Sequence, residues 1–160
     1  MPRTPPWLPS APVMFRSAAL GLSAGARSSL GVAAPVLHGR SGRPPGVRSR
    51  RRTAAAVTCV GWVLAELVAD KLPQTPSRLD RGSLAARVAT AVCGSALLCR
   101  RAGEVPLLPL SAAAAGAAVG SYGGAAWRTW SSARAPAWLG AVLEDVVALV
   151  LAGTAARDSD

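Results

Sequence analysis

Apolar residues run along this chain in long segments that are separated by short stretches rich in Pro, Gly or Arg. The alternation of apolar and polar residues that marks half-buried strands is missing, and helix-forming Ala and Leu dominate. Several segments approach the roughly 17 to 25 residues that a helix needs to cross a bilayer, although the third is short. The pattern therefore predicts an all-α integral membrane bundle of four to five hydrophobic helices, at residues 17–37, 53–70, 84–99, 106–127 and 136–156.

The predicted helical membrane domain covers residues 16–156 and is interrupted by an Arg-rich loop at 39–52. A Pro-rich tail, residues 1–15, precedes it, and we expect this tail to be disordered. A short polar tail, residues 157–160, follows it. The N-terminal region lacks acidic residues and is rich in Arg and Ser, so an organellar transit peptide stays open as an alternative.

The composition supports helices that pack in lipid. Of 160 residues, 51% are hydrophobic and 16 are Gly, whereas the chain has a single Phe and no Ile. Soluble cores of this size usually fill their volume with Ile and Phe, because protein interiors are close-packed. Small residues suit transmembrane helices, whose backbones approach one another closely.

The fourth apolar segment carries the clearest packing motif. Gly116, Gly120 and Gly124 are four residues apart and share one face of a helix. Such a series predicts a face on which another helix packs closely. Gly21 and Gly25 repeat the same interval in the first segment. The spacing leaves open whether the face packs within the chain or in a homo-oligomer.

The charge is strongly basic and unevenly distributed. The net charge is +10, six arginines lie between Arg40 and Arg52, and no acidic residue precedes Glu66. No helix-turn-helix, zinc-finger or aromatic stacking motif accompanies this stripe, so we expect no nucleic-acid partner. A cytoplasmic loop that obeys the positive-inside rule explains it better, with the lipid bilayer as the partner. Basic residues in the stretch 71–81 act against that rule, so the orientation stays open.

Acidic residues occur inside two of the apolar segments. Glu66 and Asp70 are four residues apart and share a helical face. Two carboxylates so placed in a low-dielectric site would share a proton, bind a cation or pair with arginine. Glu144 and Asp145 lie well inside the fifth segment. Because adjacent residues point about 100° apart on a helix, we expect only one of these two to face the bundle interior.

Two basic residues are the predicted charge partners of these acids. Arg27 lies in the middle of the first segment, and Lys71 follows Asp70 directly. Ionisable residues at membrane depth indicate an ion path, a proton path or a substrate site. An equally weighted reading is that Arg27, Glu66 and Glu144 pair with one another to hold helices together.

The sequence predicts neither a metal site nor catalysis. Cys59, Cys93 and Cys99 form no C-x-x-C pair, and His38 is the one histidine, so the spacing of a zinc site is missing. We expect the cysteines to act as small apolar residues within helices. Without a nucleophile–base pair, we predict that the protein is not an enzyme and needs no cofactor.

Four strings, "LGLSAGARSSLGVAAPVL", "AELVADKLPQTPSRL", "GAAVGSYGGAAW" and "LEDVVALVLA", resemble a bacterial polytopic membrane family classed as a domain of unknown function, number 4126. The resemblance runs from about Leu20 to Ala152. It implies a multi-pass helical protein of the bacterial inner (plasma) membrane, and it places the first segment in the mature domain. The family has no established activity. Its motifs fall on Ala26-Arg27-Ser28, on Glu66 with Asp70, Lys71 and Pro73, on Gly116 to Gly124, and on Glu144-Asp145.

Two functional hypotheses follow. The first is a small cation- or proton-coupled transporter, in which buried carboxylates bind the ion or carry the proton. The second is a non-transporting membrane protein whose intramembrane charges and glycine faces serve helix assembly or oligomerisation. No substrate is indicated. The candidate ion or substrate site comprises Glu66, Asp70, Glu144 and Asp145, with Arg27 and Lys71 as charge partners.

Overall fold

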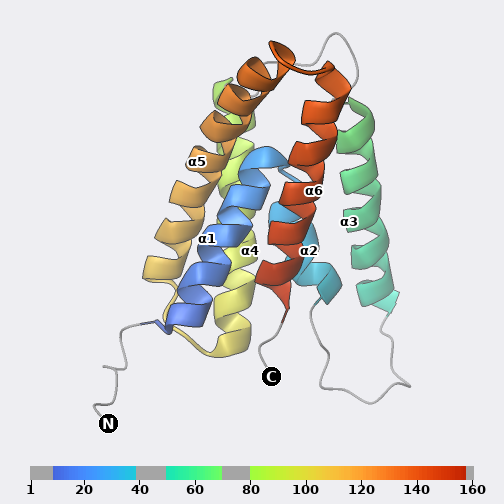
Figure 1. Ribbon diagram of the computed structural model, residues 1–160. Helices are drawn as coiled ribbons and strands as arrows, with labels where there is room; N and C mark the ends of the chain where they lie inside the picture. The colour runs from blue at the N-terminus through green and yellow to red at the C-terminus, as the bar shows by residue number, and fades with distance from the viewer. Residues whose placement is uncertain (1–8, 39–49, 70–79, 158–160) are drawn as a thin grey trace.

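The computed structural model describes residues 9–38, 50–69 and 80–157, and in these ranges the chain is all-α, without strands. The prediction of an all-α chain is confirmed, but the described part has six helices instead of four to five. The additional helix arises because the first apolar segment breaks in two. The helices are α1 (Ala11–Ala26), α2 (Leu30–His38), α3 (Arg50–Ala69), α4 (Arg81–Ala102), α5 (Leu107–Ser132) and α6 (Ala137–Ala156) (Figure 1).

The helix ends follow local chemistry. α1 begins at Ala11, inside the stretch that the sequence assigned to a disordered tail, because Pro12 suits the first turn of a helix. The Ser10 N–H also donates to Glu104 Oε2 at 2.8 Å, which ties this end to the chain after α4. Gly103 ends α4 in the left-handed conformation, with φ 68°, which glycine adopts without strain.

The first half of the broken segment, α1, runs antiparallel to α4. Near the start of α1, the Ser95 hydroxyl donates to the Ser17 hydroxyl at 2.8 Å. Near its end, the Arg87 guanidinium donates to the Gly25 carbonyl. Residues later in α1 thus contact residues earlier in α4.

The second half, α2, runs parallel to α4. Gly31 packs against the backbone of Thr90, and further along, Arg101 Nη1 donates to the Pro35 carbonyl at 2.7 Å. The chain therefore reverses between α1 and α2, and the two form a helical hairpin whose outer ends lie at the same end of the bundle (Figure 1). We call residues 27–29, which join the two helices, the hairpin tip.

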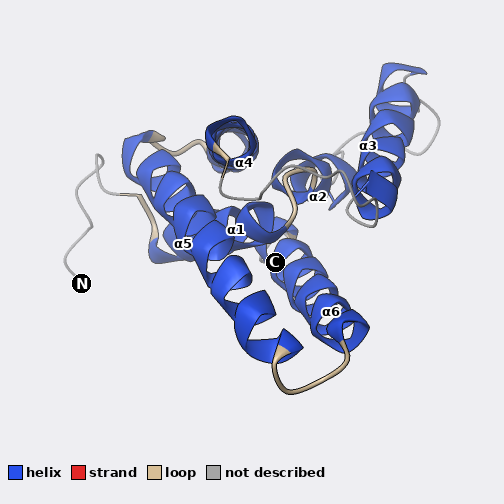
Figure 2. Cartoon of the chain, turned by 90° about the horizontal axis from the view of Figure 1, so that it is seen from above, coloured by secondary structure: helices blue, strands red, loops and turns tan. Residues whose placement is uncertain are grey.

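Glycines allow α1 to lie directly on α5. A Cβ atom at Gly116 would collide with the Ala18 carbonyl oxygen, and one at Gly120 would collide with the Leu22 carbonyl oxygen. On the α1 side, a Cβ at Gly21 would collide with the Ala113 carbonyl oxygen. The glycine faces of the two helices thus meet each other within the chain, with α1 in the middle of the bundle (Figure 2).

The outermost helix is α3, which packs against α2 (Figure 2). Its less exposed residues, Ala56, Cys59, Val63 and Glu66, recur at intervals of three and four. That interval is a single stripe on a helix. The rest of α3 is largely exposed, so this stripe carries most of its contact with the bundle.

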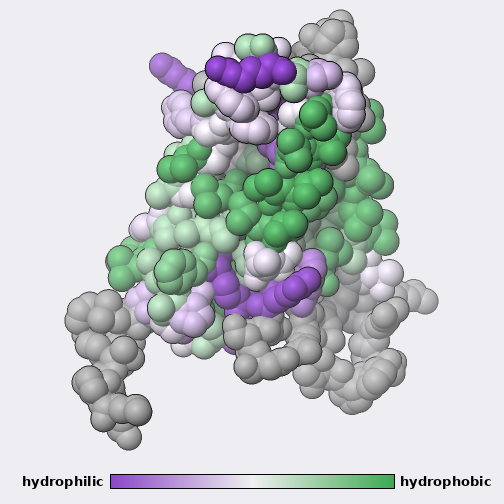
Figure 3. Space-filling view, in the orientation of Figure 1, coloured by the Kyte–Doolittle hydropathy of each residue, from purple (hydrophilic) through white to green (hydrophobic). Residues whose placement is uncertain are grey.

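Large apolar side chains are exposed on the outer helices. On α6, Val142, Val146, Val147 and Val150 are each at least half exposed. Figure 3 shows an apolar surface over the middle of the molecule, with polar residues above and below it. α4 and the stretch Trp138–Ala156 of α6 are each long and apolar enough to cross a membrane, and Thr53–Glu66 is a shorter apolar helix.

Candidate functional site

The hairpin tip is a break in regular structure that lies inside the bundle. Arg27 is 4% exposed and Ser29 is 0% exposed. A chain reversal leaves backbone groups unpaired at both helix ends, and buried groups of this kind need partners. The partners of the backbone groups come from α3, α4 and α5, and α6 binds the Arg27 side chain. Together with the tip, these side chains form what we call the polar centre.

Glu66 of α3 binds the start of α2. Its Oε1 accepts the N–H and the hydroxyl of Ser28 at 2.8 and 2.9 Å. Its Oε2 accepts the N–H and the hydroxyl of Ser29 at 2.9 and 2.5 Å. Ser29 is the N-cap of α2, because its carbonyl accepts the Ala33 N–H. A carboxylate at a helix N-terminus is stabilised by unpaired N–H groups and by the helix dipole.

Arg87 of α4 binds the end of α1. Its Nη1 donates to the carbonyls of Gly25 and Ala26, and the distance to the second is 3.2 Å. The Ser121 hydroxyl of α5 is 3.3 Å from the same Gly25 carbonyl. A cation at a helix C-terminus satisfies carbonyls that have no partner within the helix. Each helix end at the tip is therefore held by a side chain of the opposite charge.

Arg27 itself pairs with α6. Its Nε and Nη2 donate to Asp145 Oδ1 at 2.8 and 2.5 Å. The Asp145 side chain is 25% exposed, compared with 5% for Arg27. The Arg27–Asp145 ion pair therefore links the hairpin tip to the middle of α6.

The neighbouring acid also has an arginine partner, so the expectation that only one of Glu144 and Asp145 would face the interior was wrong. Arg128 Nε of α5 donates to Glu144 Oε2 at 2.8 Å, and the Glu144 side chain is 7% exposed. The two adjacent acids point to different neighbours because successive residues on a helix point about 100° apart. Both acids of this adjacent pair thus meet a cation.

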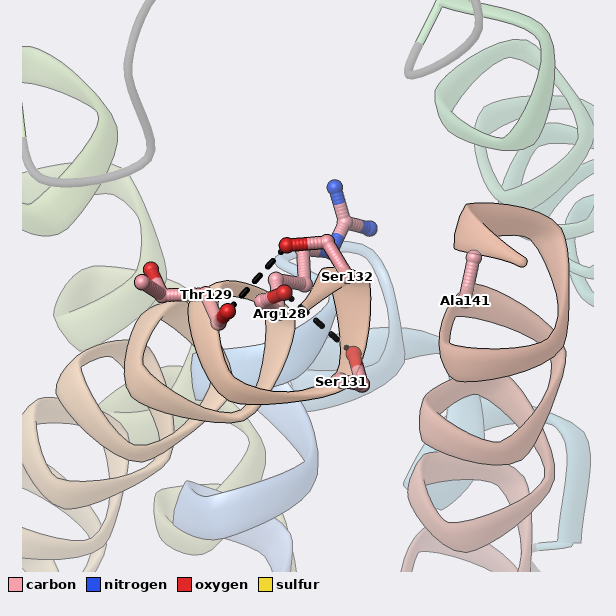
Figure 4. A pocket seen from close by; sticks show the side chains of 5 residues that line it. All are labelled: Arg128, Thr129, Ser131, Ser132 and Ala141. Carbon is pink, nitrogen blue, oxygen red and sulfur yellow. Dashed lines mark hydrogen bonds between the residues drawn. The ribbon is translucent and has the colours of Figure 1, made fainter. Parts of the chain in front are cut away.

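A hollow of about 350 Å³ opens beside this second pair. Four of its lining residues, Arg128, Thr129, Ser131 and Ser132, come from the last turns of α5, and Ala141 faces them from α6 (Figure 4). The Ser131 and Ser132 hydroxyls donate to carbonyls of their own helix. Ala141 lies one turn before Asp145, so the hollow is on the α5–α6 side of the polar centre.

Comparisons of the chain with protein-family models, with curated proteins and with solved structures found no match. The family resemblance stays a prediction, and the polar centre is interpreted from its own geometry.

The structure gathers most, but not all, of the predicted site. Glu66, Asp145 and Arg27 are at the polar centre, and Glu144 lies next to it. Asp70 and Lys71 are outside the described residues. Within the described ranges, no group of three or more His, Cys, Asp or Glu is placed to hold a metal ion. The carboxylates have separate partners there and do not form one ligand set.

The predicted packing glycines occupy two environments. Gly116 and Gly120 lie under α1, as described above. Gly124 lines a groove between α5 and α6. Gly21 and Gly25 of α1 complete the contact with α5.

Sequence reasoning missed Arg87, Ser28, Ser29 and Arg128 as members or neighbours of the polar centre. For Arg87 a signal was present, because it interrupts the apolar string "LAARVATAV" just as Arg27 interrupts the first segment. The serines carry no such signal, since Ser is common in helical segments and becomes informative only where the helix breaks.

Proposed function

We propose that the protein is a polytopic membrane protein in which α3 to α6 cross the bilayer and the α1–α2 hairpin enters it from one side. Irregular backbone at membrane depth is tolerated only where protein buries it or where it lines a water-filled cavity. The hairpin tip meets the first condition. By helical rise, Asp145 lies about 12 Å into α6, which places its partner Arg27 well away from both ends of a span.

The basic residues support one orientation. α2 ends and α3 begins at the end of the bundle where α1 starts (Figure 1), and the sequence between Arg40 and Arg52 carries six arginines. Arg100 and Arg101 lie in the last turn of α4 at this same end. The positive-inside rule makes it the cytoplasmic end. The hairpin then enters from the cytoplasm, in the inner (plasma) membrane that the resemblance implies.

The activity we propose is proton-coupled transport, with Glu66 as the proton carrier. The observation that supports it is the difference between Glu66 and the other two carboxylates. Asp145 and Glu144 bind arginines, so neutralising either one removes the carboxylate of an ion pair, and at Asp145 the arginine left behind is buried. Among the described residues, the hydrogen-bond donors to Glu66 are the neutral groups of Ser28 and Ser29.

Protonation of Glu66 therefore changes the hairpin tip without leaving an unpaired cation. An ionised carboxylate only accepts hydrogen bonds, whereas a protonated one must also donate. The protonated side chain cannot accept from all four donors in their present arrangement. The start of α2 loses partners, and the tip shifts to find others. This coupling of a proton to the position of a half-helix is what a proton-coupled transporter requires.

The proposal is tested by reconstituting the full chain in proteoliposomes and recording proton movement with an entrapped pH dye, while small ions and solutes are added in turn. The wild type moves protons with at least one solute, and Glu66→Gln abolishes that movement while still inserting. Glu104→Gln is the matched control, because Glu104 contacts Ser10 at the end of the bundle. Wild-type liposomes that move no protons with any solute, or flux that survives Glu66→Gln, would overturn the proposal.

A second candidate, a non-transporting protein whose charges hold its helices together, is supported by the two arginine–carboxylate pairs. It predicts that changes at Asp145 and at Glu66 alter stability alike and that no solute moves. Flux that depends on Glu66 separates the two functions.

A further inference from the structure

A largely apolar groove of about 530 Å³ runs between α5 and α6, and it borders the polar centre at Ala26 and Glu144. Leu22 of α1 forms part of its floor, Val119 and Gly123 form one wall, and Leu143 and Val147 form the other. The exposed valines of α6 extend the apolar lining of the groove outward. The groove therefore opens onto the apolar surface over the middle of the molecule. A cavity of this size is within the range of small-molecule sites.

Gly123 has no packing role among the described residues. A Cβ atom at Gly120 would strike α1, but a Cβ at Gly123 would meet nothing within 4 Å. Glycine in a helix interior destabilises it by about 1 kcal/mol relative to alanine. At position 120, the close approach of α1 explains why the residue is glycine. At Gly123 the bare backbone leaves that side of the groove open, with room for a partner to lie against it.

The chemistry at one end of the groove indicates what that partner is. Trp127 lines the groove, and Gly123, Trp127 and Trp130 follow at intervals of four and three, on one face of α5. The Trp127 and Trp130 rings stack with centroids 5.3 Å apart, and the Arg134 guanidinium lies 4.6 Å from the Trp130 ring centroid. Tryptophans with a basic residue are typical of the level of the lipid headgroups.

Charge complementarity selects an anionic group at this end. The sequence from Trp127 to Gly140 contains Arg128 and Arg134 and no acidic residue. The carboxylate that lines the groove, Glu144, is paired with Arg128, whereas Arg134 is exposed on the outer surface beside Trp130. Arg134 Nη1 donates to the Trp130 carbonyl at 3.2 Å, and the several N–H donors of a guanidinium suit it to binding phosphate oxygens.

We propose that the groove binds one phospholipid, with an acyl chain lying against Gly123 and the phosphate at Arg134. The inference rests on the membrane part of the proposed function and is independent of Glu66. The bound chain covers apolar surface that the bundle leaves open between α5 and α6. A second copy of this chain is the competing occupant, and the experiment below separates the two.

The test uses the purified full chain in detergent, titrated with palmitoyl-oleoyl phosphatidylglycerol and followed by native mass spectrometry. Gly123→Leu fills the groove and raises the dissociation constant about tenfold or more, because it excludes several methylene contacts. Gly153→Leu is the matched control: a Cβ there also meets nothing within 4 Å, but Gly153 does not line the groove, and binding is unchanged. Arg134→Gln weakens binding severalfold. If Gly123→Leu does not fold, Val147→Phe fills the groove from the other wall.

Equal binding by wild type and by a folded groove-filling variant overturns the inference. So does a wild-type dimer that Gly123→Leu splits while lipid binding stays the same, since the groove then holds a second copy. Binding is measured without flux. If the protein transports no protons, the lipid-binding result still stands. If a protein that inserts and transports does not bind lipid, only the proposal that the groove binds a phospholipid is refuted.

Discussion

Glu66 and Ser29 lie 37 residues apart in the chain, yet Glu66 Oε2 accepts both the N–H and the hydroxyl of Ser29, at 2.9 and 2.5 Å. This contact joins the outermost helix, α3, to the hairpin tip inside the bundle. α3 otherwise meets the bundle through a narrow stripe of small side chains. Glu66 therefore holds α3 in place as well as the start of α2.

Removing the Glu66 carboxylate should loosen α3. Glu66→Ala leaves the four donors of Ser28 and Ser29 without their acceptor, at a cost of about 1–3 kcal/mol for each one that is buried and stays unsatisfied. Cys59, which is 8% exposed on the same stripe, should then react faster with a maleimide. The measurement uses Cys93→Ser and Cys99→Ser in the background, with Glu104→Ala as the control. An unchanged Cys59 labelling rate in a folded Glu66→Ala variant would show that other contacts hold α3.

The Arg27–Asp145 pair should show strong coupling in a double-mutant cycle. Arg27→Met or Asp145→Leu alone leaves a buried charge and should lower the free energy of unfolding by about 3–5 kcal/mol. The double variant leaves no charge and should recover much of that loss. Unfolding in mixed micelles measures all four proteins. Additive losses in the double variant would contradict a direct pair.

Two glycines of α5 should respond oppositely to the same substitution. Gly120→Ala forces a Cβ into the Leu22 carbonyl and should lower the melting temperature. Gly123→Ala meets open space and should be neutral or stabilise the helix by up to about 1 kcal/mol. Thermal unfolding in detergent compares the two variants directly. Equal destabilisation by both would contradict the packing of α1 on α5.

The sequence was sufficient for the parts of the fold that depend on local composition. Apolar runs rich in Ala and Leu predicted helices, and glycines spaced by four predicted close-packing faces, because both are properties of a single helix. Charges inside those runs pointed to Arg27, Glu66 and Asp145. Their positions were informative because an ionisable group in an apolar run needs a partner wherever it is buried.

The hairpin could not be predicted in the same way. The segment 17–37 has no proline or glycine at its break, which falls at Arg27-Ser28-Ser29. What stabilises a reversal there is a carboxylate 37 residues later and an arginine about 60 residues later, at Glu66 and Arg87. Interactions over such separations are tertiary, and the local pattern of a chain does not record them. For the same reason the sequence did not predict the serines that donate hydrogen bonds to Glu66.

The hairpin is tested most directly by the distance between the two ends of the first apolar segment. Spin labels at Ser10→Cys and His38→Cys, in a chain whose native cysteines are replaced by serine, report this distance in liposomes by pulsed electron paramagnetic resonance. Because α1 and α2 fold back on each other, we predict a distance well below the about 42 Å that one continuous helix of this length would give. A single distance near that upper value would mean that the segment crosses the membrane as one helix, and it would contradict both the hairpin and the polar centre built on its tip.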